Sequence, residues 1–494
     1  MKKIIMLVFA LLGFGAAFAL SACGSNDQHH ESTPHHSLYD LRGIALERRL
    51  NIQRPDYARL IELTAGREQQ TIDIDVFFGQ APPMSSLTPQ QAADDALLFF
   101  DALRQIYGLY IYFGGDEVFT PIFDGIIAEI FTRDALTPIQ LRQIIAAPLN
   151  PIINDNHFRL SGISGPSATF HTSRTPFDRD GYGFRHRESG LLVAEIEGHD
   201  KQEVFRLSMD ESGDVFYSLV VYSLEPSVPW TRTLNLIFED GSEYAATLDR
   251  LAQNRRSHRS PSLSFVDDIP VVTIASLNAY THHGGFNNQE AADFLSFARE
   301  LRNEPAIILD IRGNSGGNGI LAVQWLYELT GHIVPENHVW LSTFTYEELS
   351  REPVGAFTPP ADYFRRYVGF APFDETHSIM SFVNDTGNLI ESNPLIIMLV
   401  DRYVASTGEG FVNKMFGMAN TLAIGQNTAG IFLGDGVYTM AGMTLPNSGI
   451  EFGFGRGVIA HPQGHFAEGV GIAPDVWVHG DTLAAALVLL GSLN

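Results

Sequence analysis

The sequence predicts an α/β protein in which a helical region and a small β-rich region precede the main sheet. Three observations support this fold class. Unbroken apolar runs at 306–309 and 395–400 are each followed by a helical pattern, which is typical of buried parallel strands. Helix-start signals recur between residues 41 and 158, and short alternating runs separated by turn residues fill 159–250.

The first residues are predicted to lie outside the fold. Lys2 and Lys3 precede an apolar run at 4–20, a pattern typical of a secretory signal. Leu-Ser-Ala-Cys at 20–23 resembles the bacterial lipoprotein box, which implies a signal peptide at 1–22 and a lipid on Cys23. The alternative is an ordinary signal peptide with a chance cysteine. Residues 23–40 are polar and His-rich and are predicted to be a flexible tether.

Residues 41–158 are predicted to form an N-terminal helical domain. Thr88 and Thr137 each precede a proline and have a glutamine three residues later, which is a capping box with proline at the first helical position. Apolar residues follow at helical spacing after both threonines. The region ends near Asp155-Asn156-His157.

The next part of the chain has the pattern of short strands. Residues 159–250 contain β-type runs, and Glu-Asp-Gly-Ser at 239–242 predicts a hairpin between the last two. A polar, basic stretch within 251–264 is predicted to be a linker. Residues 265–494 then alternate strands and helices, with an amphipathic helix at 289–302.

The charge balance excludes one class of partner. The formal net charge is −25, whereas binding to nucleic acid phosphates needs a basic face. The chain has 1 cysteine, so an intramolecular disulfide is impossible.

Two segments have the features of a hydrolase site. Asp-Ile-Arg-Gly-Asn-Ser-Gly-Gly at 310–317 follows an apolar strand, and its glycines can turn peptide N–H groups toward a developing negative charge. Ser406 follows the next apolar strand and opens a helix, where free N–H groups favour an oxyanion. Taken alone, this segment favours Ser406 or Thr407 as a helix cap over a nucleophile. The glycine turn lacks the Lys-Ser/Thr pair of a phosphate-binding loop.

The order of the motifs resembles the C-terminal processing (tail-specific) peptidase family. The resemblance covers residues 265–480 and includes 310–317, Ser-Thr-Gly-Glu at 406–409, 425–430, and Glu-Gly-Val-Gly-Ile-Ala-Pro-Asp at 468–475. It implies a crotonase/ClpP-like catalytic core, preceded by a helical bundle and a PDZ-like β module at 159–250.

One departure from the family pattern concerns the base. The processing proteases pair their serine with a lysine, but Ile431 stands at that position here. Lys414, on the same helix as Ser406, is expected to be a surface charge. The chain instead resembles the tricorn-core-like branch, in which a histidine before the PDZ-like domain is the base. This resemblance implies a triad of Ser406, His157 and Glu468, with Glu468 orienting the imidazole.

The resemblance also implies an oxyanion hole built from the N–H groups of Thr407 and Gly316, with Gly317 as the near alternative. Other histidines are weaker candidates for the base, namely His282, His283, His461 and His465. Glu409 is expected to be a helix N-terminal acid. Asp310 and Asp475 are expected to be structural, with Arg312 pairing with one of them.

The predicted function is that of a lipid-anchored, extracytoplasmic serine peptidase of the bacterial cell envelope. It would cleave peptides or protein tails through an acyl-enzyme, with no metal or organic cofactor and with the membrane as a partner through Cys23. The first alternative is a catalytically inactive peptide-binding or scaffold protein on the same fold. A crotonase-like enzyme acting on a thioester is disfavoured, because coenzyme A is absent from a secreted location.

Overall fold

The computed structural model describes residues 37–52, 72–78, 83–252, 261–277, 288–334, 339–342, 370–372, 378–380, 389–434, 443–455 and 457–491. The predicted signal peptide, Cys23 and most of the tether lie outside the described residues, as do His282 and His283. None of the helices in the described ranges is long and apolar enough to cross a membrane.

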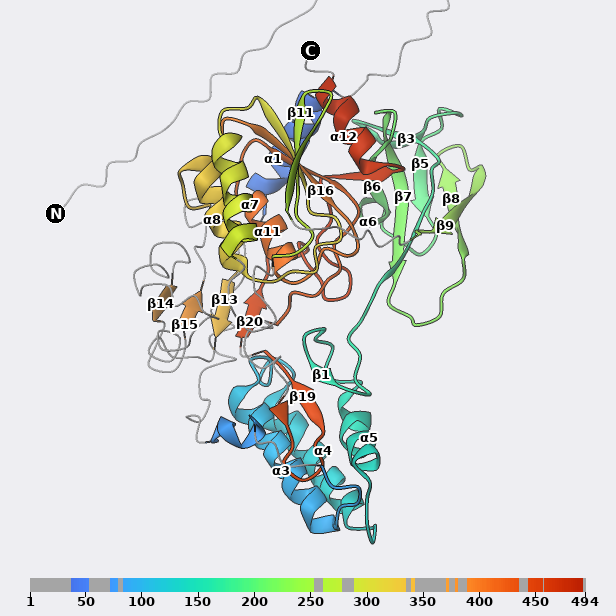
Figure 1. Ribbon diagram of the computed structural model, residues 1–494. Helices are drawn as coiled ribbons and strands as arrows, with labels where there is room; N and C mark the ends of the chain where they lie inside the picture. Colours follow the sequence, from blue (N-terminus) through green and yellow to red (C-terminus); the bar gives the residue numbers. More distant parts are fainter. Residues whose placement is uncertain are drawn as a thin grey trace, which may run out of the picture. The chain divides into compact units, whose positions relative to one another are not determined.

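Five parallel strands form the centre of the main sheet, in the order β11-β12-β16-β17-β21. Two of them, β11 and β16, are labelled in Figure 1. They span Ile269–Thr273, Ala306–Asp310, Leu395–Val400, Thr421–Gly425 and Val476–His479. Every residue of β12 and β16 is buried, as their unbroken apolar runs predict. The α/β fold class is therefore confirmed.

Helices pack on both faces of this sheet. One face is covered by α7 (Asn288–Glu300), α8 (Gly319–Thr330) and α11 (Thr407–Met415). The other face packs against α1 (Leu38–Leu50) and α12 (Thr482–Gly491). Alternate residues of one strand serve the two layers, so that Ile307 faces the first core and Ile308 the second.

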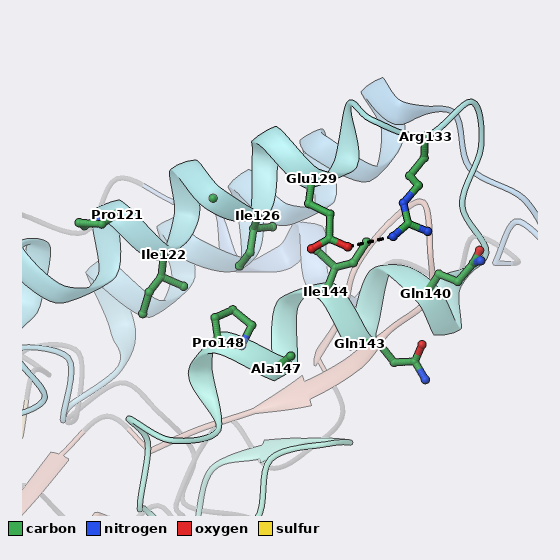
Figure 2. Close-up of a pocket in the computed structure, with 11 residues that line it drawn as sticks. Pro121, Ile122, Ile126, Glu129, Arg133, Gln140, Gln143, Ile144, Ala147 and Pro148 are labelled. Atoms are coloured by element: carbon green, nitrogen blue, oxygen red, sulfur yellow. Dashed lines mark hydrogen bonds and ion pairs between the residues drawn. The ribbon is translucent and has the colours of Figure 1, made fainter.

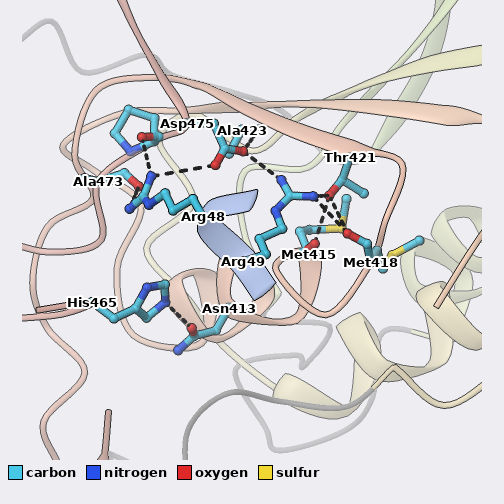
Figure 3. A network of polar contacts seen from close by, with 11 residues as sticks. Arg48, Arg49, Asn413, Met415, Met418, Thr421, Ala423, His465, Ala473 and Asp475 are labelled. Carbon is cyan, nitrogen blue, oxygen red and sulfur yellow. Dashed lines mark hydrogen bonds and ion pairs between the residues drawn. The ribbon is translucent and has the colours of Figure 1, made fainter. Parts of the chain in front are cut away.

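Helix α1 belongs to the core of the main sheet, although the sequence places it in the tether and the helical domain. Buried Arg49 donates to Asp475 Oδ2 at 2.7 Å and to Thr421 Oγ1 at 2.6 Å, and Arg48 donates to the Pro474 carbonyl at 2.9 Å (Figure 3). The pairing gives Asp475 the structural role that was expected of it. The sequence pattern of 38–50 could not predict that this helix binds Asp475, which is 426 positions from Arg49 in the chain.

The predicted helical region contains η1 (Ile74–Phe78), α3 (Pro89–Ile106), α4 (Gly115–Ile130) and α5 (Pro138–Leu149). Both predicted capping boxes, at Thr88 and Thr137, are present. The helices share one core with a small sheet of β1 (Arg159–Leu160), β19 (Glu451–Gly453) and β18 (Met443–Thr444). The C-terminal part of the chain thus contributes to this core.

The β-rich region is joined to the main sheet. Strand β6 (Phe205–Asp210) pairs in parallel with β21, so the sheet continues through β7 (Val215–Ser223), β2 (Thr169–Thr172), β9 (Glu243–Arg250), β8 (Thr231–Phe238) and β5 (Val193–Ile196). The predicted hairpin joins β8 and β9. The PDZ-like identity of this region stays a prediction.

The remaining elements are short. Strands β3 (Phe177–Asp180) and β4 (Gly183–His186) pair beside β7, α6 spans Lys201–Val204, and β10 (Ser262–Val266) pairs with β11. A separate sheet contains β14 (Phe370–Pro372), β15 (Ser378–Met380), β13 (Val339–Ser342) and β20 (Gly457–Ala460).

Two surface cavities lie in the helical region. One of about 670 Å³ opens between α4 and α5, where Glu129 and Arg133 form an ion pair at its edge (Figure 2). The other, of about 610 Å³, is lined by the start of α5 and by β1 and β19, and it includes Phe158 and Arg159. The lining of the second cavity includes Phe158, the residue that follows His157 in the chain.

Candidate active site

Ser406 lies at the carboxyl end of β16, in a strained turn that opens α11. Its backbone has φ 53° and ψ −125°, and Ser406 is one of three non-glycine residues with positive φ among the described residues. Such a conformation costs on the order of 1–3 kcal/mol and persists where the surroundings enforce it. A strained strand-to-helix turn is also how hydrolases expose a nucleophilic serine.

The glycine turn after β12 lies against this serine, because β12 and β16 are neighbouring parallel strands whose carboxyl ends meet. A Cβ on Gly316 would lie 2.9 Å from Ser406 Cβ, and one on Gly408 would lie 2.8 Å from the Asn314 carbonyl oxygen. Gly316 also has φ +101°. Only glycine allows this approach of the two turns.

His157 lies in the turn after α5, and its Nε2 is 2.9 Å from Ser406 Oγ. Its peptide N–H donates to Asp155 Oδ1 at 2.9 Å, and Tyr107 Oη donates to the other oxygen of the same carboxylate at 2.9 Å. Asp155 and Tyr107 are both fully buried. The loop that presents the imidazole is thus held by the core of the helical region.

Burial keeps this imidazole neutral. Desolvation is the largest cause that lowers the pKa of His157 to about 4, the nearby charge of Arg159 lowers it further, and the Gly434 backbone opposes the shift. Nδ1 is buried and lies next to the backbone of Gly434, and no carboxylate of the described residues binds it. A neutral imidazole next to a serine hydroxyl can accept its proton.

Glu468 does not contact the imidazole, in contrast to the orienting role that the sequence suggests. Its Oε1 accepts the Asn156 N–H at 2.9 Å, and its Oε2 accepts the N–H groups of Phe432 at 3.2 Å and Leu433 at 2.9 Å. Burial, followed by the neighbouring charge of Asp155, raises the pKa of Glu468 to about 8. Glu468 therefore acts on the peptide before His157.

The three predicted oxyanion-hole residues lie together, but their N–H groups differ. The N–H of Gly316 donates to Asn314 Oδ1 at 2.9 Å, which differs from the prediction that it faces an oxyanion. The N–H groups of Gly317 and Thr407 have no partner among the described residues. Thr407 Oγ1 donates to the Gly317 carbonyl at 2.8 Å and joins the two turns.

Glu409 has more contacts than a helix N-terminal acid needs. It is fully buried, and it accepts the N–H groups of Gly430 at 2.9 Å, Ile431 at 2.7 Å and Ser406 at 3.2 Å, and the Thr428 hydroxyl at 2.5 Å. Burial is the largest cause that raises the pKa of Glu409. Only its spacing in Ser-Thr-Gly-Glu hinted at a link to Ser406.

The expectation that Lys414 is a surface charge is wrong. Its exposed fraction is 7%, and burial lowers its pKa to about 7. The reason is that every residue of α11 from Gly408 to Met415 is buried, so this helix has no solvent face. Helical spacing alone could not show this.

The other residues considered as candidates have separate partners. His461 Nε2 is 2.8 Å from the Phe432 carbonyl oxygen, and His465 Nε2 is 2.6 Å from Asn413 Oδ1. Arg312 forms a buried ion pair with Asp310 at 2.6 Å, as expected.

Comparisons with known proteins found similarity in the part of the chain that contains Ser406. Residues 270–478 match the profile of peptidase family S41. No curated protein matches the chain. Among solved structures, the chain is similar to mature CPAF at 14% identity, with 78% of this chain and 92% of that chain covered and a TM-score of 0.40.

Two further solved structures are similar over a large part of the chain. The photosystem II D1 C-terminal processing protease has 15% identity, coverage of 78% and 92%, and a TM-score of 0.35. The tricorn protease has 13% identity, coverage of 81% of this chain and 37% of that chain, and a TM-score of 0.32.

Proposed function

We propose, from the match of residues 270–478 to the profile of peptidase family S41, that Ser406 and His157 are the nucleophile and base of a serine peptidase. The observation that carries the proposal is the 2.9 Å separation of His157 Nε2 and Ser406 Oγ. It joins two residues that lie 249 positions apart in the chain, and the serine is held at a positive φ.

The reaction follows the logic of an activated serine. Neutral His157 takes the Ser406 proton as Oγ attacks the substrate carbonyl, then gives it to the leaving amine, and the acyl-enzyme forms. Water, activated by the same imidazole, hydrolyses the ester. The N–H groups of Gly317 and Thr407 are our candidates for the oxyanion donors. The mechanism uses no metal ion or organic cofactor.

Glu468 is proposed to support the catalytic pair indirectly, through a contact with the backbone next to His157. Because its carboxyl group holds the Asn156 N–H, it supports the peptide from which His157 projects.

The substrate is proposed to be an extended peptide bound along β1. This strand is at the edge of its sheet, and its residues line the cavity of about 610 Å³, together with Phe158, which follows His157 in the chain. An edge strand offers backbone groups to an added strand. A photo-crosslinking residue at Ser161 should capture a peptide substrate, whereas one at Gln143, in the cavity between α4 and α5, should not.

The location is proposed to be the outer side of a bacterial membrane, through a lipid on Cys23. The support is the Leu-Ser-Ala-Cys sequence that follows the apolar run at 4–20. Growth with an alkyne fatty acid should label the wild type and not Cys23→Ser. A labelled Cys23→Ser protein would reject the anchor.

A fluorophosphonate probe tests the catalytic assignment. It should label wild type at pH 7, fail on Ser406→Ala, and react at least about 100-fold more slowly with His157→Ala. His465→Gln is the matched control, because this buried histidine contacts Asn413 and should leave labelling unchanged. A wild type that is not labelled between pH 6 and 9 would favour the peptide-binding or scaffold function instead.

A further inference from the structure

Four consecutive peptide N–H groups, those of residues 430–433, donate to only two carboxylates. Gly430 and Ile431 donate to Glu409 at 2.9 and 2.7 Å, and Phe432 and Leu433 donate to Glu468 at 3.2 and 2.9 Å. We call residues 430–433 the carboxylate-held segment. All four peptide N–H groups of the segment are therefore bound to the side chains of Glu409 and Glu468.

Each carboxylate also holds one side of the catalytic pair. Glu409 accepts the N–H of Ser406 at 3.2 Å, and Glu468 accepts the N–H of Asn156, next to His157, at 2.9 Å. A continuous path of contacts therefore runs from the nucleophile through Glu409, the carboxylate-held segment and Glu468 to the base.

A third contact closes this path into a ring. The Asn156 side chain donates to the Gly430 carbonyl at 3.1 Å, so the loop of the base touches the segment at both ends. Nearby, buried Arg402 donates to the carbonyls of Val470 at 2.8 Å and Gly469 at 3.1 Å, next to Glu468 in the chain. Arg402 thus stabilises the backbone that directly follows Glu468.

The strained backbone of Ser406 needs neighbouring contacts that hold it in place. Its φ of 53° persists only if neighbours over-determine it, and Glu409 binds the N–H of the strained residue itself. Among the described residues no carboxylate contacts the imidazole directly, because Asp155 and Glu468 bind peptide N–H groups, so such a contact does not set the separation of Ser406 Oγ and His157 Nε2.

We propose that Glu409 is a positioning residue, which together with Glu468 sets the distance between Ser406 Oγ and His157 Nε2 through the carboxylate-held segment. The proposal rests on the proposed function for its kinetic consequence and on the contacts above for its geometry. Glu409 touches neither substrate nor the reacting atoms, so its effect is indirect.

Glu409→Gln is the principal test. The amide keeps the size of the side chain but replaces one of the two acceptor oxygens with a donor that faces peptide N–H groups. We expect kcat to fall about 10- to 100-fold, with KM changed by less than about twofold, because misplacement affects the attack and not the peptide contacts. Glu409→Asp, which keeps the charge, should recover part of the loss.

Asp95→Asn is the matched control. Asp95 is also a fully buried carboxylate that accepts two consecutive peptide N–H groups, those of Asn447 at 3.1 Å and Ser448 at 2.7 Å, but it lies in the helical region. Its loss should lower Tm and leave kcat per folded molecule unchanged. A Glu409→Gln enzyme that behaves in the same way would overturn the proposal.

The double variant Glu409→Gln/Glu468→Gln tests the joint action. If both carboxylates act through one segment, its kcat should be no lower than that of the more severe single variant. Losses that multiply would show that the two act independently, which contradicts a shared segment.

A readout without activity separates this proposal from the proposed function. If wild type is not labelled by the fluorophosphonate, the function fails, and the ¹⁵N imidazole resonances of His157 still test the geometry. We expect Glu409→Gln to shift them and Asp95→Asn to leave them in place. Unchanged resonances in Glu409→Gln would overturn the positioning role, whether or not the wild type reacts.

Discussion

Protonation of His157 is expected to control activity at an unusually low pH. Its pKa is about 4, mainly because the imidazole is buried and secondarily because of Arg159. An unshifted imidazole would be about half protonated at pH 6.5, whereas this one would be about 99% neutral there. We therefore expect kcat/KM to be flat between about pH 5.5 and 7 and to fall tenfold per pH unit below about 4.

The same pKa shift predicts acid instability with a defined sign. Because the folded pKa lies below the unfolded value of 6.5, the unfolded state binds more protons between the two values. The stabilising contribution of the neutral His157 should be fully present above about pH 6.5, and it should decrease by about 3 kcal/mol as the pH falls to about 4. Intrinsic fluorescence at each pH must confirm that the protein is folded where rates are measured.

The assay measures kcat/KM and the rate of fluorophosphonate labelling across pH 3.5–8 for three proteins. Arg159→Gln removes a charge that lowers the pKa of His157, so its acid limb should move to higher pH. Arg142→Gln is the control, because this guanidinium lines the same cavity and is not among the groups that shift the imidazole. A wild-type inflection near pH 6.5, or an acid limb that Arg159→Gln leaves in place, would refute the reasoning.

Three further predictions address the fold and the site. Arg49→Ala should lower the free energy of unfolding in urea by about 3 kcal/mol, because it removes the closest cation, at 2.7 Å, from the buried Asp475 carboxylate. Arg48 is 3.7 Å from Asp475 and its side chain is 36% exposed, so Arg48→Ala should cost far less, and equal losses would contradict the network. Gly316→Ala should abolish fluorophosphonate labelling through its 2.9 Å clash, whereas Gly331→Ala, with positive φ but open space, should cost about 1 kcal/mol of stability and keep labelling. The pKa of Glu468 is about 8, so the folded state holds this proton more tightly than the unfolded state, and stability from this group should decrease between about pH 4.5 and 8. Glu468→Gln should flatten that decrease, and a variant curve parallel to wild type would argue against it.

Local patterns predicted much of the framework. The capping boxes at Thr88 and Thr137 and the hairpin at 239–242 depend on residues close in sequence, and all three are present. The buried strands at 306–309 and 395–400 were recognisable because a strand covered on both faces must be apolar throughout.

The site was predictable only where its chemistry shows in a short motif. Ser406, Gly317 and Thr407 lie in turns with a recognisable order. Ile431 cannot accept a proton, and His157 was predicted because Asp155-Asn156-His157 resembles the histidine segment of the tricorn-core-like branch. That His157 Nε2 lies 2.9 Å from Ser406 Oγ depends on packing between distant parts of the chain.

Only the tertiary structure determined the burial and the partners of the charged side chains. The sequence by itself determined the strands, the caps and the turns, because these follow from the spacing of neighbouring residues. It could not show that Lys414 and Glu409 are buried, that α1 is tied to Asp475, or that Glu468 binds a peptide N–H and not the imidazole. The free energy of a charge is set by the burial and the partners that the rest of the fold brings to it, and no local pattern encodes those.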